Sequence, residues 1–421
     1  MDCVLPVELN RTSAIGSDSI ELIETVEGFE KLREEWSQLL ETSDSRCFFL
    51  TWEWLYTWWK HLSNNRSLFL LTVRSGEDLV AIVPLARKPP SFPLSSGTLE
   101  FLGTGTAGSD YLDFIIQRGK QQDVLPALAE YLVRENALLE LAQIKRGDGL
   151  AVEFAGQCIE QGWRSWETSI NVCPTINLTG HTWDSYLATL GSEHRYNFRR
   201  KLKNLSNRFE VRFEMARSED ERKEALTTLV SLHSLRWEER GGSDAFFIPE
   251  HVSFHDELSS LALQQGRLRL FTLRLDGRPA ASLYGFRYGK VFYFYQSGFD
   301  PSFASSSVGL ITMGLAIQSA IEEGAEEFDL LHGAEKYKFL WAHETRDLGR
   351  LELYPPGLWG FIWKQARAVT RGTKKMARNV LPQRVSEMIA AARRNRNRKG
   401  FYVSIPRKDD RLPCLTLDRN G

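Results

Sequence analysis

Hydrophobic residues follow two different spacings in the early part of the chain. In "GFEKLREEWSQLLETS" they recur every three or four positions, which predicts an amphipathic helix with Phe29, Trp36 and Leu39 on one face. "TWEWLYTWWKHL" has the same spacing, and we interpret Trp52 and Trp59 as part of a core face and not as an aromatic ligand cage. "SLFLLTVRSGEDLVAIVPLARK" then has two apolar runs around a Ser-Gly-Glu-Asp turn, which predicts an antiparallel hairpin.

The same hairpin pattern recurs much later, in "RLRLFTLRLDGRPAASLYGFRYGK", where Thr272 matches Thr72 and Ala281 matches Ala81. Related stretches, "CFFLTWEWL" and "AFFIPEHVSF", precede the two hairpins in the same order. These matches predict an internal duplication of a unit of roughly 170 residues. Each unit is expected to contain a strand, helices, the hairpin, a further strand, a helix and a strand. The predicted fold class is α/β (α+β), with mixed, mostly antiparallel sheets.

A chain of 421 residues is too long for one ordinary core, so two tandem domains are expected. Residues 361–400 contain twelve Lys or Arg and a single acid, Glu387, although the net charge of the chain is only -1. Apolar residues recur every three or four positions among these cations, which predicts a basic amphipathic helix. The predicted division is a disordered N-terminus (1–18), a first domain (19–175), a second domain (176–355) and a basic helical tail with a flexible end (356–421).

Composition argues against several classes of protein. The five cysteines are scattered and form no Cys-x-x-Cys pair or Cys/His cluster, so neither a disulfide framework nor a metal site is predicted. The N-terminus lacks a secretory signal, and no apolar run approaches the roughly 20 residues that a bilayer span needs. The near-zero net charge predicts no DNA partner. We therefore expect a cytoplasmic protein.

The stretch "GFDPSFASSSVGLITMGLAIQSAIEEG" contains the most informative loop. Ser306, Ser307, Val308 and Gly309 precede a long helix predicted over 310–323. Backbone N–H groups at the start of a helix bind anions, and small side chains let a phosphate approach the backbone. The loop therefore predicts a donor site, with the alternative that a serine simply caps the helix.

The next stretch, "EEFDLLHGAEKYKFLWA", predicts a strand that ends beside the start of that helix. Asp329, His332, Tyr337 and Lys338 follow one another closely at this strand end. A histidine or tyrosine there can transfer a proton, and a lysine can hold a phosphate or polarise a carbonyl. The alternatives are a hydrogen-bonded strand-end histidine for His332 and a solvated charge for Lys338.

Two predicted helices upstream supply further candidates. Arg195, Arg199 and Lys203 follow at i, i+4 spacing in "SEHRYNFRRKLKNL", which predicts a cationic face for a phosphorylated or carboxylated substrate, or a solvated face. His233 and Trp237 lie in "LVSLHSLRWEERG", where His233 is either a core residue or a base.

"GTGTAGSDYLDF" has the glycines of a phosphate loop but no Gly-Lys-Ser/Thr after them, so it is not a P-loop. Asp110 and Asp113, which flank Tyr111 there, are weaker candidates to face a substrate channel.

The order of "HRYNFRRKLKNL", "LHSLRW", "DGRPAASLYGF", "YFYQSGFDPSFASSSVGL" and "AEEFDLLHGAEKYKFLWA" resembles the CelD-like acetyltransferases of bacterial cellulose and exopolysaccharide gene clusters. These belong to the GNAT superfamily, and their tandem organisation is similar to that of FemAB-type aminoacyltransferases. The resemblance covers about residues 20–355. It implies a double GNAT fold with the acyl-donor site in the second half. By position, it implies functional roles for Arg195, Arg199, His233, Trp237, Gly309, Asp329, Gly333, Tyr337, Lys338 and Trp341.

One departure from the family concerns the donor. The GNAT pyrophosphate loop is an Arg/Gln-rich glycine pattern, whereas "SSSVGL" has one glycine and no arginine. FemAB-type relatives use aminoacyl-tRNA and need no such loop, so the donor stays open between acyl-CoA and aminoacyl-tRNA.

The sequence therefore predicts an acyltransferase that moves an acyl group, acetyl in the first place, from acyl-CoA to an amine or hydroxyl of a sugar or cell-envelope precursor. Proton transfer is expected from His332, Tyr337 or His233, and donor binding from residues 306–309. Backbone N–H groups of the central strand are expected to polarise the thioester carbonyl. The expected substrate-binding residues are Arg195, Arg199, Trp237, Asp329, Gly333, Lys338 and Trp341.

The basic tail predicts peripheral contact with an anionic inner membrane, or, as the alternative, an extra helix packed on the domain. Two other functions remain open. One is a FemAB-type peptidyl transferase, in which the tail and the Arg-rich helix bind tRNA. The other is a non-catalytic scaffold of polysaccharide biosynthesis.

Overall fold

The computed structural model describes residues 12–15, 18–89, 97–238, 246 and 248–380. The chain divides into two compact units, Met1–Lys364 and Gln365–Gly421, and the first contains the whole sheet. We call the elements β1 to α5 its first half and α6 to β13 its second half, with β8 and β14 shared between them.

The first half and the shared strand β8 contain these elements in chain order: β1 (Thr12–Ile15), β2 (Asp18–Ile23), α1 (Val26–Lys31), α2 (Arg33–Thr42), the 3-10 turn η1 (Phe48–Leu50), α3 (Trp52–Leu62), β3 (Ser67–Ser75), β4 (Asp78–Lys88), β5 (Thr98–Phe101), β6 (Ile115–Ile116), α4 (Gln121–Glu135), β7 (Leu138–Lys145), α5 (Leu150–Glu160) and β8 (Arg164–Asn177). The second half and the shared strand β14 contain these: α6 (Trp183–Thr189), α7 (Ser192–Arg208), β9 (Val211–Met215), α8 (Glu219–Glu238), α9 (Pro249–Gln264), β10 (Leu268–Leu275), β11 (Arg278–Tyr288), β12 (Val291–Phe299), η2 (Pro301–Ser306), α10 (Val308–Glu322), β13 (Glu327–Asp329), η3 (Lys338–Leu340) and β14 (Glu344–Tyr354).

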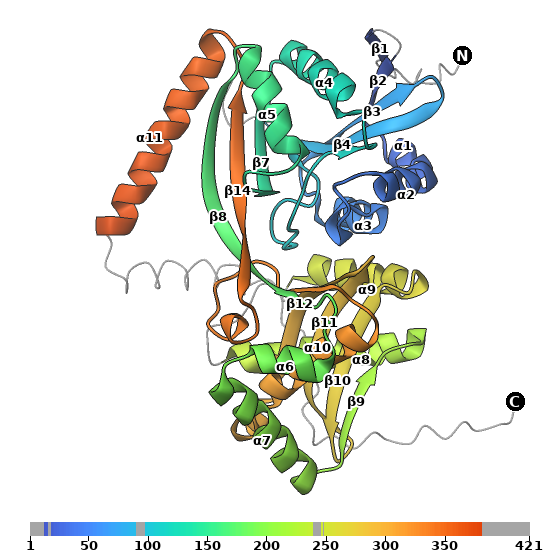
Figure 1. Ribbon diagram of the computed structural model, residues 1–421. Coiled ribbons are helices and arrows are strands. Elements are labelled where there is room, and N and C mark those ends of the chain that lie inside the picture. Colours follow the sequence, from blue (N-terminus) through green and yellow to red (C-terminus); the bar gives the residue numbers. More distant parts are fainter. Residues whose placement is uncertain (1–11, 16–17, 90–96, 239–245, 247, 381–421) are drawn as a thin grey trace, which may run out of the picture. The chain divides into compact units, whose positions relative to one another are not determined.

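One twisted sheet runs through both halves (Figure 1), in the order β1-β2-β3-β4-β5-β7-β14-β8-β13-β12-β11-β10-β9, with β6 added on β4. Only β5/β7 and β12/β13 pair in parallel among the described strands, and the other pairs are antiparallel. The mixed, mostly antiparallel α/β fold predicted from the sequence is therefore confirmed. The two long strands β8 and β14 pair with each other and join the halves, because β14 also pairs with β7 and β8 with β13.

The two halves repeat the same hairpin. β3/β4 and β10/β11 both shift register after equivalent residues, between Val73 and Arg74 in the first and between Leu273 and Arg274 in the second. A shared irregularity at matching positions is a strong sign of duplication, because a bulge is a specific local feature. The domain boundaries stay a prediction. One difference concerns residues 12–15, predicted as disordered, which form β1 because their backbone groups pair with the edge strand β2.

Helices cover both faces of the second half. Side chains of β12 alternate, so Phe292 and Phe294 pack with α10 residues such as Ile317, while Tyr293 faces the core that contains α8 and α9. Gly314 of α10 lets α7 come close, because a Cβ there would lie 2.2 Å from the ring of Phe198. The sheet is therefore sandwiched between α8/α9 on one face and α6/α7/α10 on the other.

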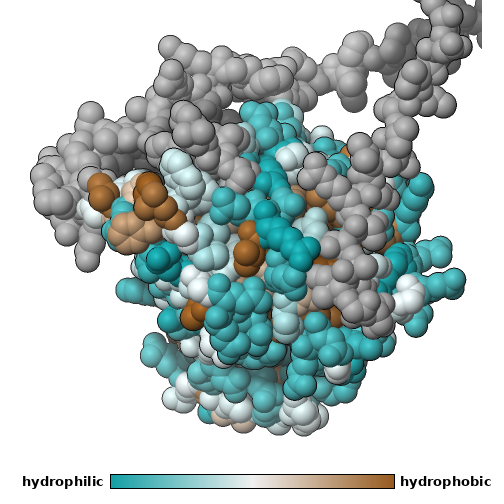
Figure 2. Space-filling model, turned by 90° about the horizontal axis from the view of Figure 1, so that it is seen from above, coloured by the Kyte–Doolittle hydropathy of each residue, from teal (hydrophilic) through white to brown (hydrophobic). Residues whose placement is uncertain are grey.

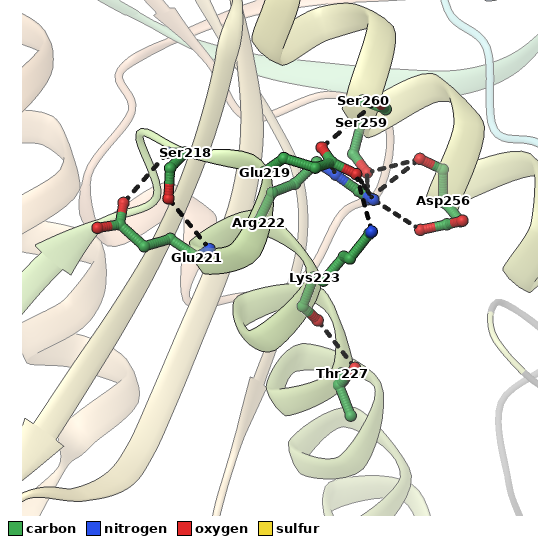
Figure 3. Close-up of polar contacts among 9 residues, drawn as sticks. All are labelled: Ser218, Glu219, Glu221, Arg222, Lys223, Thr227, Asp256, Ser259 and Ser260. Atoms are coloured by element: carbon green, nitrogen blue, oxygen red, sulfur yellow. Dashed lines mark hydrogen bonds and ion pairs between the residues drawn. The ribbon is translucent and has the colours of Figure 1, made fainter.

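A buried arginine ties α8 to α9 (Figure 3). The side chain of Arg222 is 1% exposed, and its Nε and Nη2 each donate to Glu219 at 2.7 Å. Its Nη1 donates to the hydroxyl of Ser259 at 2.7 Å and to the carbonyl of Asp256 at 3.1 Å, and Nη2 also reaches the Asp256 carboxylate at 2.9 Å. This network fixes the helix pair, because a buried guanidinium is stable only when its donors are satisfied.

The surface drawn in Figure 2 is predominantly hydrophilic, with separate hydrophobic patches. Exposed large apolar side chains include Leu358, Trp359, Phe361 and Ile362, close together at the start of α11 (Leu358–Val380). The predicted basic helix is thus present over Leu358–Val380, and the rest of the predicted tail, residues 381–421, lies outside the described residues. None of the described helices combines the length and the apolar character that a membrane span needs.

Candidate active site

The parallel strands β12 and β13 separate and open the second half. They pair over only three residues, from Val291 opposite Glu327 to Tyr293 opposite Asp329. Beyond that point β12 continues along β11 to Phe299, whereas the chain after Asp329 follows β8, where the backbone N–H of Leu330 donates to the carbonyl of Pro174 at 3.0 Å. The two strands therefore diverge, and none of the described strands pairs with β12 on its β13 side after Tyr293.

A cavity of about 320 Å³ lies at this opening. Its walls come from the ends of β11 and β12, the first turns of α10, the segment 337–341 and the end of α8. The residues that matter for the chemistry are Arg236, Ser297, Gly298, Gly309, Tyr337 and Trp341. Of the predicted donor residues 306–309 only Gly309 lines the cavity, and of the predicted strand-end cluster only Tyr337 does, together with Trp341 further along.

The start of α10 is not capped by a serine side chain. Ser307 occupies the N-cap position in a left-handed conformation, with φ of 56°, and its side chain makes no capping hydrogen bond. Ser306 ends η2, and Val308 is buried in the core, so its side chain cannot meet a ligand. Gly309 lines the cavity. The alternative that Ser307 caps this helix is thus wrong, and none of the described side chains makes the capping hydrogen bond at the start of α10.

The strand β12 contains a bulge close to the cavity. Tyr284 of β11 pairs with Gln296, but the next residue, Gly285, pairs with Phe294, so Tyr295 has no partner on β11. A bulge re-aims the backbone groups of a strand, and such groups can polarise a carbonyl. The predicted carbonyl-polarising role of the central strand stays a prediction.

The strand-end segment places its predicted residues in different surroundings. Tyr337 lines the cavity, and burial raises the pKa of its hydroxyl above the ordinary value. Trp341 is fully buried between the cavity and the rings of His194 and Phe198, and its carbonyl accepts a hydrogen bond from Tyr186 at 2.8 Å. Both residues are therefore well placed for substrate contact or for shaping the wall.

Lys338 is not a solvated charge. Its side chain is buried and its Nζ donates to the carbonyl oxygens of Leu331, at 3.1 Å, and His332, at 2.8 Å. The carboxylate of Glu335 lies 3.1 Å from the same nitrogen. Three partners satisfy the three ammonium protons, so Lys338 holds the loop together and has no donor left for a phosphate. Gly333 permits this tight loop, since a Cβ at its φ of 124° would lie 2.3 Å from Glu335.

His332 makes an ion pair with an aspartate of the first half. Its Nδ1 lies 2.8 Å from Oδ1 of Asp110, and its backbone N–H donates to Oδ2 of the same carboxylate at 2.9 Å. The hydrogen bond with Asp110 raises the pKa of His332 above its ordinary value. His332 is thus hydrogen-bonded at the strand end, as one of the two interpretations predicts, and it is partly exposed as a base would be.

Asp329 lies on the other face of the sheet from the donor cavity. It is fully buried, its Oδ1 accepts a hydrogen bond from the backbone of Leu331 at 2.7 Å, and burial raises its pKa to about 7. Its carboxylate borders a second cavity of about 410 Å³ that includes first-half residues such as Tyr111 and Asp113. The structure therefore separates Asp329 from Gly309, Tyr337 and Trp341.

The predicted cations of α7 have structural partners. Arg195 donates to the carbonyl of Ala188 at 3.1 Å, at the end of α6, and Arg199 pairs with Asp184 at 3.1 Å. Lys203 is exposed. The neighbouring Lys201, which sequence reasoning missed, donates to the carbonyl of Ser305 at 3.2 Å and so links α7 to the donor loop.

The α8 candidates separate in the same way. His233 is buried against the ring of Phe246, and desolvation together with the nearby Arg236 lowers its pKa to about 4. His233 is therefore an uncharged core residue at neutral pH. Trp237 lies in α8, but its side chain is outside the described residues. Arg236 borders the cavity and its Nη1 donates to Ser297 at 3.3 Å. Arg236 belongs to the motif "LHSLRW", so the sequence motif identified the turn of α8 that borders the cavity, although it did not single out Arg236.

Gly298 shows why α8 lies so close to β12. A Cβ at this residue would lie 2.4 Å from the backbone nitrogen of His233. Only glycine fits, and its absence of a side chain brings α8, and with it Arg236, to the cavity. Among the described residues, no group of three or more His, Cys, Asp or Glu side chains could hold a metal ion.

Comparisons with known proteins agree with this geometry. Residues 192–339 match the family model described as an acetyltransferase (GNAT) domain. The fold is similar to the crystal structure of FemX, with a TM-score of 0.56 and 12% identity over 76% of this chain and 95% of that chain. It is also similar to a conserved protein of unknown function from Bacteroides thetaiotaomicron, with a TM-score of 0.50 and 13% identity over 79% of this chain and 98% of that one.

A tandem GNAT protein from the clavulanic acid biosynthesis pathway has a TM-score of 0.44 and 12% identity, over 80% of this chain and all of that one. No curated protein sequence matches the chain. At these identities, the likeness to FemX and to the Bacteroides protein shows the fold alone. Residues 192–339 of the second half thus resemble an acetyltransferase (GNAT) domain, and the CelD-like assignment stays a prediction.

Proposed function

We propose that the protein transfers an acyl group, acetyl in the first place, from acyl-CoA to an amine or hydroxyl of its acceptor. The observation that carries this proposal is the cavity of about 320 Å³ between the end of β12, the start of α10 and the segment 337–341. It lies inside the GNAT-matching segment apart from its last two residues, Leu340 and Trp341. A cavity with mostly apolar walls and a few polar groups is typical of small-molecule sites.

The parts of the cavity suggest how the donor binds. The free N–H groups at the start of α10 suit the phosphates of CoA, and Gly309 leaves room for them. The apolar side chains Leu283 and Met313 suit the acyl group and the adjacent arm of the donor. The bulge at Tyr295 suits the thioester carbonyl, because an unpaired strand N–H can donate to a developing oxyanion.

The donor test uses a side chain that fills the cavity. Gly309→Leu starts without a clash, since the nearest atom to a Cβ there is Cδ1 of Phe299 at 3.7 Å, and circular dichroism checks that the variant folds. Calorimetric titration with acetyl-CoA is expected to show binding to the wild type and at least tenfold weaker binding to Gly309→Leu. Gly156→Leu is the matched control, because Gly156 is an exposed helical glycine in α5 with nothing within 4 Å. Equal affinity of Gly309→Leu and wild type contradicts the assignment of the cavity.

An aminoacyl-tRNA donor is the second candidate, and the exposed cations of α7 favour it. Arg200, Lys203 and Arg208 are exposed on the helix whose Lys201 contacts the donor loop. Phosphate contacts make RNA binding fall steeply with salt. Binding of tRNA that weakens with salt and with Lys203→Ala, and no binding of acetyl-CoA, would favour this donor.

The acceptor class, a sugar or cell-envelope or exopolysaccharide precursor, rests on the sequence resemblance. The basic tail is proposed to hold the protein at an anionic membrane surface, because exposed Leu358, Trp359 and Phe361 open a helix rich in cations. Cosedimentation with phosphatidylglycerol vesicles, compared with phosphatidylcholine vesicles, tests it. Equal recovery with both vesicles contradicts it.

A further inference from the structure

The two halves repeat the same hairpin, but the strand edge beside it is built differently in each half. In the second half, β12 runs along β11 as one strand with a single bulge. In the first half, two separate strands fill the equivalent edge of β4. β5 pairs with residues 85–88, and β6 pairs with Ala81 and Ile82. The chain leaves the sheet between them, and we call residues 102–114 the excursion.

The excursion leaves the first half where the second half has its bulge. Ala81 and Ala281 are equivalent, so Pro84 and Leu85 correspond to Tyr284 and Gly285. The register shift of β11 lies between Tyr284 and Gly285. The break between β5 and β6 lies at the same position of β4, where the backbone N–H of Leu102 donates to the carbonyl of Pro84 at 2.9 Å. The equivalent position of the strand edge therefore has a bulge in the second half and a long loop in the first half.

The excursion is held firmly in place. The hydroxyl of Ser109 donates to the carbonyl of Gly103 at 2.8 Å and accepts from the indole of Trp54 at 2.8 Å. The backbone N–H of Leu112 donates to the carbonyl of Gln143 at 3.0 Å. These contacts fix the loop on both sides of Asp110.

Asp110 reaches the second half from this loop. Its side chain is fully buried, and the carboxylate accepts from both the backbone N–H and Nδ1 of His332. Gly108, with φ of 68°, has a left-handed backbone conformation that favours glycine, and a Cβ there would be in ordinary contact with Cε1 of His332 at 3.5 Å. Among the described residues, none is hydrogen-bonded to Nε2 of His332, whose side chain is 35% exposed.

The charges around His332 are few. Besides Asp110, the groups that affect it are the ammonium of Lys338, which lowers its pKa, and the carboxylate of Glu335, which raises it. Lys338 also binds the carbonyl of His332, and the next residue before it, Tyr337, lines the cavity. The imidazole and the cavity are therefore joined by one short, internally bonded segment.

We propose that the first half completes the reaction centre of the second, with Asp110 as a positioning residue that holds His332 as the general base. This inference rests on the proposed acyl transfer. Nδ1 of His332 is committed to Asp110, which leaves Nε2 to take a proton from the acceptor amine or hydroxyl. The acceptor nitrogen or oxygen forms a bond to the acyl carbon, the bond from that carbon to sulfur breaks, and the departing CoA thiolate takes up the proton.

This arrangement gives the first half a role of its own. The excursion interrupts the strand edge of β4 and supplies a carboxylate to the other half. A carboxylate on Nδ1 fixes the tautomer of an imidazole and stabilises the protonated ring during the reaction.

The pairing is tested by NMR titration of the Cε1 proton of His332 in the full chain, identified by its loss in His332→Gln. The midpoint in Asp110→Asn is expected to fall below that of the wild type, because the amide carries no charge. Asp113→Asn is the matched control, since Asp113 belongs to the same excursion but accepts hydrogen bonds from Ser45, Leu150 and Ala151 instead. Equal midpoints in the wild type and Asp110→Asn overturn the proposal.

The role in the reaction is tested by release of CoA from acetyl-CoA, with water as the acceptor. In Asp110→Asn, kcat is expected to fall at least tenfold, with the rising limb of its pH profile moved to lower pH. KM for acetyl-CoA and the folded state, followed by circular dichroism, are expected to stay unchanged, and Asp113→Asn to keep the wild-type pH profile. An unchanged kcat and pH profile in Asp110→Asn overturn the positioning role. A wild type that titrates as expected but does not bind acetyl-CoA contradicts the proposed donor and still supports the pairing.

Discussion

The buried Arg222 allows a quantitative test of what holds α8 against α9. Arg222→Met keeps most of the side-chain volume but removes the charge and every donor of the network in Figure 3. The carboxylates of Glu219 and Asp256 are 45% and 59% exposed, so water can replace the arginine there. The hydroxyl of Ser259 and the carbonyl of Asp256 lose a donor inside the helix pair. Breaking a buried pair costs about 3–5 kcal/mol, and the exposed carboxylates place the expected loss near the lower limit, at about 3 kcal/mol.

That loss converts into a change of Tm. The unit Met1–Lys364 has an unfolding entropy of about 0.8 kcal/mol per degree, at the usual value per residue, so Tm is expected to fall by about 4 °C. Differential scanning calorimetry of the full chain measures it. Arg212→Met is the matched control, because Arg212 pairs with Glu210 on the surface and both are exposed. Its Tm is expected to equal that of the wild type.

Arg222→Lys separates charge from geometry. A lysine keeps the positive charge but loses the planar fork that reaches four partners, so its Tm is expected to lie between those of the wild type and Arg222→Met. The reasoning is refuted if Arg222→Met melts within 1 °C of Arg212→Met.

Three further outcomes are expected. Gly298→Ala places a Cβ 2.4 Å from the backbone nitrogen of His233, so it should lower stability by about 1–3 kcal/mol in thermal melts, and an unchanged Tm would show that α8 can move away freely. Burial lowers the pKa of His233 to about 4 and that of His255 to about 3, whereas both titrate near 6.5 when unfolded. The folded state disfavours protonation of both imidazoles, so their contribution to stability is complete above pH 6.5 and falls as the pH drops from 6.5 towards 4. Tm measured across this range should decline less in a His255→Gln variant than in the wild type. A wild-type Tm that stays constant across the range contradicts the burial argument. Lys338→Met leaves two carbonyl oxygens without their donor and should lower both Tm and the rate of acyl transfer, while Lys336→Met, on the exposed side of the same segment, should change neither.

Local sequence patterns were sufficient to predict most helices and strands and the loop before α10 that borders the cavity. The spacing in "TWEWLYTWWKHL" corresponds to α3, because helix periodicity depends only on neighbours in sequence. Of the two tryptophans predicted for its core face, Trp52 is buried and Trp59 only half-buried, whereas Trp54 and Trp58 are fully buried. The small residues before α10 identified the loop at the cavity for the same reason. The duplication was visible because both hairpins keep matching residues, such as Thr72 and Thr272, around a turn that contains glycine.

Charge and exposure were less predictable. Lys338 looks like a surface cation in the sequence, and its burial depends on carbonyl groups that converge only in the folded loop. Asp329 and Tyr337 are eight residues apart at one strand end, yet they lie in different cavities. Strand alternation sets the face of a side chain, but only the packed helices decide what that face meets.

The sequence by itself determined the strands, the helices, the repeated hairpin and the small-residue loop, because each depends on spacing within a short stretch. Only the tertiary structure decided that Asp110 meets His332, 222 positions away, and that the excursion interrupts the strand edge of β4. Those features depend on how β8 and β14 join the halves into one sheet. Pairing between distant strands is set by the energy of the whole fold and leaves no periodic trace in the sequence.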